Sequence, residues 1–340
     1  MRSHAIRNPN LRSDLTYRRL TIVFVTLIAC ASAAAADVES RVARDPAKLK
    51  LASLNAVVID ASAKRPVYQK GADDVTPIAS LTKLMTAIVT LDAHLPMDAA
   101  IAIDTEDFDY LKGTRSRLRM GAMLPRREML RLALMSSENR AASSLARNYP
   151  GGTDAFVAAM NDKARALGMT RTSFADPTGL SARNVSTAND LATLVATAAD
   201  YAEIRQFSTT PSHYVEVQPT GQLLGFNNTN RLVNSSGWDI QLSKTGYIRE
   251  AGKCLVMMAT IASKSFVIVL LDSAGKYTRL GDAQRVRHWL ETGQALAPAA
   301  APKGTSKPAK VKTVSYKAPK QAKGAVKVKA ASISKPARRA

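Results

Sequence analysis

Short β-prone runs stand at both ends of a mainly helical middle, and this order constrains the fold more than any other feature of the chain. Near the amino end, Ala56–Asp60 and Pro66–Gln69 flank the polar turn Ala63–Arg65 and predict a hairpin. Near the carboxyl end, four β-prone runs precede a closing helix; the runs are 214–217, 239–244, 254–261 and 266–271, and the helix is 276–291. This order predicts an α+β fold, in which both ends of the chain build one antiparallel sheet and the middle forms an inserted helical subdomain.

Five segments of the middle show a helical apolar period or a helix-start signal: 81–95, 126–135, 139–149, 153–168 and 187–199. Ser80 stands in the N-cap position of the first segment. The polar residues 136–138 separate the second segment from the third. We therefore expect the two sides of this break, and the start of the first helix, to expose polar side chains.

Residues 1–36 have the order of an export signal. Arg18 and Arg19 precede the apolar run Leu20–Ala29, and the small residues Ala31–Ala36 allow A-x-A cleavage. Cleavage is expected rather than a permanent membrane span, for which the apolar run is short. An alternative is a lipoprotein signal, because Leu27–Cys30 resembles a lipobox in which Cys30 would be acylated.

Most of the net charge of +21 lies at the two ends of the chain and not in the predicted folded part. Twelve Lys and Arg lie in 302–340 and a net +4 lies in 1–36, which leaves only +5 for the segment between them. No nucleic-acid partner is therefore expected for the folded part. We divide the chain into the signal, a short linker at 37–53, a folded domain at 54–294 and a disordered Lys/Ala/Pro-rich tail at 295–340. The tail could adhere to anionic envelope polymers or be a solubilising extension.

Cysteine and histidine give no sign of a disulfide or a metal site. After signal cleavage Cys254 would be the only cysteine, and its apolar surroundings predict a buried, inert thiol. The four histidines, at positions 4, 94, 213 and 288, lack ligand spacing. No metal or other cofactor is expected.

Three short motifs occur in order: Ser80–Lys83 (SLTK), Ser137–Asn139 (SEN) and Lys244–Gly246 (KTG). Each is weak alone, since Ser332–Lys335 also spells S-x-x-K and Ser53–Asn55 also spells S-x-N. Their positions make a shared active site more credible, because the first motif begins a predicted helix, the second lies in the break between two predicted helices and the third ends a predicted strand.

The spacing of Ser80 and Lys83 suits nucleophilic catalysis. A serine hydroxyl needs a neighbouring base, and a lysine three residues along a helix lies on the same face. Lys83 must then be partly uncharged, through desolvation or a nearby cation such as Lys244. The simpler interpretation is that Ser80 only caps the helix while Lys83 points to solvent.

The remaining motif residues suit substrate binding. Backbone N–H groups of Ser80 and Tyr247 could bind an oxyanion, with Gly246 allowing close approach. Lys244 and Thr245 suit a substrate carboxylate. Ser137 could pass a proton to a leaving amine, and Asn139 could hold the acyl-side amide and Lys83 in place. The simpler interpretation of both residues is a helix cap.

Four extended stretches resemble the penicillin-recognising serine hydrolases: Pro77–Ala87, Leu132–Ala142, Phe174–Ser181 and Gln241–Tyr247. The resemblance covers about 54–291 and is closest to low-molecular-mass penicillin-binding proteins of the D-alanyl-D-alanine carboxypeptidase and endopeptidase group, in particular the periplasmic endopeptidase type. It implies a transpeptidase-like or β-lactamase-like sheet packed between helices.

The resemblance also implies a role in cell-wall biogenesis and cell shape, with peptidoglycan stem peptides as substrates and β-lactams as covalent inhibitors. Ser80 would be acylated, Lys83 would accept its proton, Ser137 would be the third active-site member and Lys244 would contact substrate. Carboxypeptidases of the group usually continue into a second β-domain and a membrane helix, whereas a basic tail follows here. This departure favours a soluble periplasmic endopeptidase that cuts D-alanyl-diaminopimelate cross-links over a carboxypeptidase.

Two other classes of protein are alternatives. A class A β-lactamase needs a glutamate in an E-x-x-x-N pattern, which is absent between Met160 and Lys244. A polymer-binding protein driven by charge would depend on residues 302–340.

Overall fold

The computed structural model describes residues 44–275 and 277–296. The predicted export signal with Cys30, residues 37–43 of the predicted linker and residues 297–340 of the predicted tail lie outside the described residues. None of the described helices is long and apolar enough to cross a lipid bilayer.

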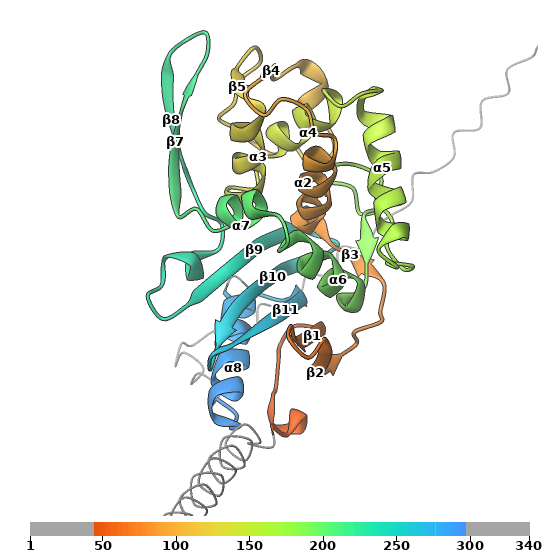
Figure 1. The fold of residues 1–340 in the computed structure, drawn as a ribbon, viewed down its shortest axis with the longest axis vertical. Coiled ribbons are helices and arrows are strands. Elements are labelled where there is room, and N and C mark those ends of the chain that lie inside the picture. The colour runs from red at the N-terminus through yellow and green to blue at the C-terminus, as the bar shows by residue number, and fades with distance from the viewer. Residues whose placement is uncertain (1–43, 276, 297–340) are drawn as a thin grey trace, which may run out of the picture. The chain divides into compact units, whose positions relative to one another are not determined.

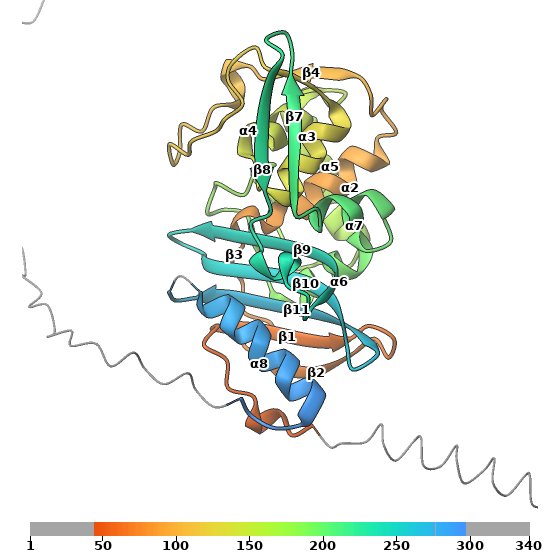
Figure 2. The same ribbon diagram turned by 90° about the vertical axis from the view of Figure 1, so that its left-hand side faces the viewer.

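The sheet confirms that both ends of the domain build one antiparallel layer (Figures 1 and 2). Its order is β2-β1-β11-β10-β9, and every neighbouring pair is antiparallel. The strands are β1 (Asn55–Asp60), β2 (Arg65–Lys70), β9 (Asp239–Ile248), β10 (Gly252–Ile261) and β11 (Lys264–Ser273). The pairing of β1 with β11 joins the predicted amino-terminal hairpin to the carboxyl-terminal strands, and it leaves β9 at an edge.

The sheet is covered by helices on both faces (Figure 1). Helix α8 (Thr278–Thr292) packs on one face and α6 (Ala188–Ala198) on the other. Val57 and Val58 of β1 are both fully buried but belong to the two different cores, because successive side chains of a strand point to opposite faces. The central strands are therefore apolar on both sides, which explains their continuous apolar runs.

The helical subdomain lies between β2 and β9 in the sequence. In addition to α6, its helices are α2 (Lys83–Asp92), α3 (Arg126–Met135), α4 (Asn139–Arg147), α5 (Gly152–Ala166) and α7 (Ala202–Ser208). Its small strands are β3 (Thr76–Pro77) with β6 (Val185–Ser186), β4 (Ala100–Ala102) with β5 (Met123–Pro125), and β7 (Ser212–Val217) with β8 (Gln222–Asn227). The single-turn 3₁₀ helices of the domain are η2 (Pro46–Lys48), η3 (Ala79–Thr82), η4 (Thr105–Asp107) and η5 (Arg231–Asn234). The five predicted helices are confirmed within a few residues. The predicted run 214–217 lies in β7, but it does not join the main sheet as expected, because β7 pairs with β8 in a separate two-stranded sheet. Helix α7, strand β8 and the short strands β3 to β6 were not predicted.

The predicted position of Ser80 at a helix N-cap is wrong. Ser80 lies inside η3, and α2 begins only at Lys83. The turn is tightened because the Thr82 hydroxyl donates to the carbonyl of Ala79 (2.8 Å), which itself has a positive φ of 49°. At its other end α2 stops at Asp92 instead of Leu95, because His94, directly after the Ala93 cap, has a left-handed φ of 50° that ends the helix.

Residues 44–53, which belong to the predicted linker, pack against α8. The Trp289 indole donates to the carbonyl of Asp45 (3.1 Å), and the buried Asp282 carboxylate accepts from the backbone of Ala52 and Ser53 (3.0 and 2.7 Å). Leu49 is buried in the same core. Packing therefore begins before the predicted domain boundary at residue 54.

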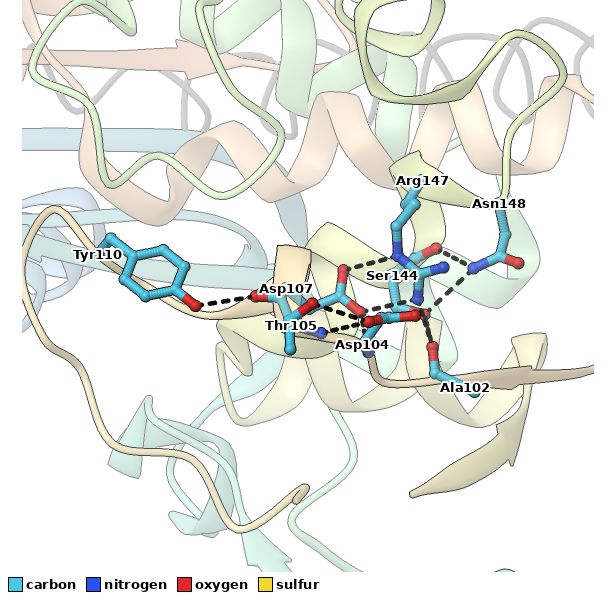
Figure 3. Close-up of polar contacts among 8 residues, drawn as sticks. All are labelled: Ala102, Asp104, Thr105, Asp107, Tyr110, Ser144, Arg147 and Asn148. Atoms are coloured by element: carbon cyan, nitrogen blue, oxygen red, sulfur yellow. Dashed lines mark hydrogen bonds and ion pairs between the residues drawn. The ribbon is translucent and has the colours of Figure 1, made fainter. Parts of the chain in front are cut away.

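A buried ion pair holds the outer part of the helical subdomain together (Figure 3). The Asp107 carboxylate is fully buried and lies 2.9 Å from Nη2 of Arg147, which also donates to the carbonyl of Ala102 (2.6 Å). The carboxylate accepts a further bond from the backbone of Asp104 (2.8 Å). This network joins η4 and β4 to α4.

We expect Asp107→Ala to lower the free energy of unfolding by about 1–3 kcal/mol, because it removes the carboxylate partner of Arg147, a side chain that is only 21% exposed, and the acceptor of the Asp104 backbone N–H. Urea denaturation measures the change. Asp162→Asn is the matched control, since its pair with Arg165 is exposed, and a change within about 0.5 kcal/mol is expected there. Equal losses in the two variants would contradict the prediction.

Candidate active site

A cleft of about 610 Å³ lies between the helical subdomain and the edge strand β9. It brings together side chains from all three sequence motifs. Its lining is Ser80, Lys112, Thr114, Ser137, Asn139, Leu180, Thr229, Thr245, Gly246, Tyr247, Ile248, Arg249 and Arg279. A larger cavity of about 820 Å³, beside α6, contains none of the motif residues, so the chemistry points to the smaller cleft.

The Lys83 amine lies directly beneath Ser80. Its Nζ is 3.0 Å from Ser80 Oγ, 2.7 Å from Asn139 Oδ1 and 2.6 Å from the carbonyl oxygen of Thr178. The side chain is fully buried. The simpler interpretation, in which Lys83 points to solvent, is therefore wrong.

Burial lowers the pKa of Lys83 to about 7. Loss of hydration disfavours the charged amine and outweighs the attraction of Asp176, Glu138 and Asp109, which act in the opposite direction. Near neutral pH a substantial fraction of this amine is therefore uncharged, so it is able to accept a proton from the hydroxyl beside it.

Lys244 is the second buried amine of the site. Its Nζ donates to Ser137 Oγ and to the carbonyl oxygen of Thr245, both at 2.9 Å. Burial lowers its pKa well below the ordinary value, and repulsion from Lys83 and Arg279 lowers it further. A negatively charged ligand beside Lys244 would relieve both effects.

The break between α3 and α4 turns two motif side chains toward these amines. Ser137 has a φ of 61°, a left-handed conformation that a serine adopts only under constraint from its surroundings. The side chain that caps α4 is that of Glu138, which accepts from the backbone of Arg140. Ser137 and Asn139 therefore do not act as the side-chain cap, and their polar atoms face Lys244 and Lys83 instead.

Thr114 sets the orientation of the Asn139 amide. Its Oγ1 accepts from Asn139 Nδ2 (2.9 Å), which leaves Oδ1 facing Lys83. The loop that carries Thr114 is held by the Asp109 carboxylate, which accepts from the backbone of Leu111 and Thr114 (both 2.9 Å). The sequence carries no signal for this contact, since the residues are polar and far from the motifs.

Gly246 allows β9 to approach the turn that carries Ser80. A Cβ at position 246 would lie 3.0 Å from the carbonyl oxygen of Ile78 and 3.2 Å from the Ser80 nitrogen, closer than most real contacts. The predicted need for a glycine here is confirmed. Tyr247 follows directly and lines the same cleft as Ser80, with its side chain largely exposed.

The stretch 174–181, one of the four that carry the family resemblance, contacts the Lys83 amine through the Thr178 carbonyl. The Asp176 carboxylate accepts from the backbone of Thr178 and Gly179 (2.6 and 2.8 Å). Gly179 has a φ of 80°, and a Cβ there would lie 2.0 Å from the carbonyl oxygen of Ala79. This tight loop presents the Thr178 carbonyl to the amine.

Arg279, at the start of α8, is a cleft residue that sequence reasoning missed. Its Nη1 donates to the carbonyl oxygen of Gly246 (3.0 Å). Its Nε is buried without a hydrogen-bond partner among the described residues. With Lys244 and the Thr245 hydroxyl, it gives this end of the cleft donors for an anion.

Comparisons with known proteins agree with this geometry. A family profile described as D-alanyl-D-alanine carboxypeptidase matches residues 41–275. The chain is 52% identical over 257 residues to a D-alanyl-D-alanine endopeptidase of Pseudomonas aeruginosa, covering 75% of this chain and 83% of that protein. It is 48% identical over 253 residues to one of Escherichia coli K12, covering 74% and 82%.

Solved structures show the same fold. The Streptomyces K15 DD-transpeptidase superposes with a TM-score of 0.67 at 28% identity, covering 72% of this chain and 98% of that chain. The ampicillin-bound form of penicillin-binding protein D2 from Listeria monocytogenes gives a TM-score of 0.61 at 28% identity, covering 71% and 98%. The expected transpeptidase-like α+β fold is confirmed, and the chain belongs to the S11 family of serine peptidases, the D-alanyl-D-alanine carboxypeptidase family.

Proposed function

We propose that this protein is a serine-type D-alanyl-D-alanine endopeptidase that hydrolyses D-alanyl-diaminopimelate cross-links of peptidoglycan through an acyl-enzyme on Ser80. The observation that carries the proposal is the Lys83 amine, buried and 3.0 Å from Ser80 Oγ at the floor of the cleft. Support for the endopeptidase activity comes from the relatives at 52% and 48% identity, which both bear that name.

Acylation follows from the arrangement of the two serine–lysine pairs. Neutral Lys83 takes the proton of the Ser80 hydroxyl as Oγ attacks the D-alanyl carbonyl. The oxyanion is bound by the backbone N–H groups of Ser80 and Tyr247. When the C–N bond breaks, the Ser137 hydroxyl gives a proton to the leaving amine and takes one from Lys244. The proton that Lys83 took from Ser80 is passed on to Lys244, so Lys83 is neutral again before deacylation begins.

Deacylation returns the site to its starting state. A water molecule takes the place of the departed amine and attacks the ester carbonyl, while an active-site base, for which we propose Lys83, receives its proton. As the ester bond to Ser80 breaks, Lys83 gives that proton to Ser80 Oγ, which restores the neutral amine and the hydroxyl. Asn139, held by Thr114, binds the amide on the acyl side and keeps Lys83 in place throughout.

The cationic end of the cleft selects the leaving group. Lys244, Thr245 and Arg279 bind the free carboxylate of the residue that follows the scissile bond. Both a terminal D-alanine and the D-centre of diaminopimelate carry such a carboxylate. Carboxypeptidase activity is therefore the alternative, which these residues alone do not separate from endopeptidase activity.

The same groups suit a β-lactam, which combines a carboxylate, a reactive carbonyl and an acyl amide. Ring opening would leave the acyl group on Ser80. The ampicillin-bound Listeria neighbour supports this inhibition. Because 160–244 lacks the E-x-x-x-N pattern of class A β-lactamases, the adduct is expected to be hydrolysed slowly.

We expect Ser80→Ala to reduce cleavage of cross-linked muropeptides by roughly 10⁴-fold or more. Chromatography of the products also compares cross-link cleavage with release of D-alanine from a pentapeptide. Ser62→Ala changes a serine outside the cleft whose hydroxyl donates to Asp60 in its own turn, and it should retain activity. Retention of cleavage by Ser80→Ala, or penicillin label on another residue, would refute the mechanism.

The rate of Ser80 acylation by benzylpenicillin should rise as the pH increases through about 7 and then level off, because the protonated Lys83 cannot accept a proton. Stopped-flow measurements between about pH 5.5 and 8.5 would show this profile. Lys83→Arg, which stays charged, should be inactive throughout. A rate independent of pH would argue against Lys83 as the base.

We also propose that the protein is exported and acts in the periplasm. The proposal rests on the charged, apolar and small-residue order of 1–36 in the sequence. Intact-mass analysis of the mature protein should find a chain that begins close to Asp37. A diacylated Cys30 would instead indicate a lipid anchor, and a full-length cytoplasmic chain would refute export.

A further inference from the structure

An ion pair joins the two walls of the cleft at its rim. Lys112 Nζ, from the loop between η4 and β5, lies 2.7 Å from Glu250 Oε1 in the turn between β9 and β10. Lys112 lines the cleft, as does Arg249, the residue before Glu250. The two side chains are 31% and 38% exposed, and ion pairs with such exposure contribute little to folding stability.

The two walls lead away from the carboxylate-binding end toward this rim. Along β9 the chain passes from Lys244 through Gly246, beside Ser80, to the end of the strand at Ile248, and Arg249 and Glu250 follow in the turn to β10. On the opposite wall, Asn139 contacts Thr114, and Lys112 is two residues away. The charges therefore lie on the acyl side of the reaction centre, opposite the leaving group.

We propose that Lys112, Arg249 and Glu250 form a subsite for the free amino-acid end of the diaminopimelate residue that precedes the scissile D-alanine. This inference rests on the proposed function, because it assigns the acyl side of the same cleft. The ligand group carries an ammonium and a carboxylate on one carbon, at the end of a three-methylene side chain. Such a chain extends along the cleft beyond Asn139.

The charges of the rim match this group. The ligand carboxylate takes the place of Glu250 beside Lys112, with Arg249 as a second cation. The ligand ammonium takes the place of Lys112 beside Glu250. Each protein charge exchanges one partner for another, so the ion pair opens without leaving a charge unpaired. A ligand with only one of the two charges would leave either Glu250 or Lys112 without its partner.

The test compares the rates at which two penicillins acylate Ser80. One carries a D-α-aminopimelyl side chain, and the other is its N-acetyl derivative, which lacks the ammonium. In the unmodified protein the free-amine compound should react roughly tenfold faster. Glu250→Gln should bring the ratio close to one, because the ammonium loses its partner. Lys112→Met should slow both compounds, because both carry the carboxylate that Lys112 binds. Arg127→Met is the matched control, because its exposed pair with Asp98 (2.9 Å) does not line the cleft, and it should keep the ratio.

A ratio separates the subsite from general damage, since a misplaced Ser80 slows both compounds alike. Equal rates in the unmodified protein, or an unchanged ratio in Glu250→Gln, would overturn the subsite. Penicillin acylation requires no peptide hydrolysis. If the protein cleaved no muropeptide but still showed the expected ratios, the proposed function would fail while the subsite stood.

Discussion

The rest of the site depends on two lysine amines buried side by side. Lys83 and Lys244 are almost completely excluded from water, and each contacts a serine hydroxyl, on Ser80 and on Ser137. A buried, unpaired ammonium is costly, so both amines have lowered pKa values. In the proposed mechanism this cost supplies the neutral base, and the cationic end recovers interaction energy when it binds a substrate carboxylate.

The topology places these two amines on different parts of the domain. Lys83 comes from the helical subdomain, and Lys244 comes from an edge strand of a sheet built by both ends of the domain. Because β9 has no neighbouring strand beyond it, a peptide can lie along it in the cleft. Gly246 then brings that strand close enough to Ser80 for one carbonyl group to contact both walls.

The loop at 109–114 connects the catalytic groups to the rim of the cleft. The Asp109 carboxylate organises its backbone, Thr114 orients Asn139, and Lys112 reaches Glu250. The same segment therefore contacts both Asn139, the partner of the proposed base Lys83, and Glu250 of the proposed acyl-side subsite. A ligand bound at the rim would contact the 109–114 loop, and this loop is joined to Asn139 by the hydrogen bond of Thr114. Binding at the rim could therefore change the position of Asn139 and with it the rate of the reaction.

The sequence by itself determined the kinds of element and the chemistry, because strand and helix periods and the S-x-x-K, S-x-N and K-T-G spacings are local properties of the chain. The hairpin at 55–70, the break at Ser137 and the glycine at 246 were all readable in this way. Only the tertiary structure decided that Ser80 sits in a 3₁₀ turn and that Lys83 is buried, and only it brought Thr114, Thr178 and Arg279 into the site. Those contacts join residues far apart in sequence, and burial depends on what packs around a side chain, which no local pattern records.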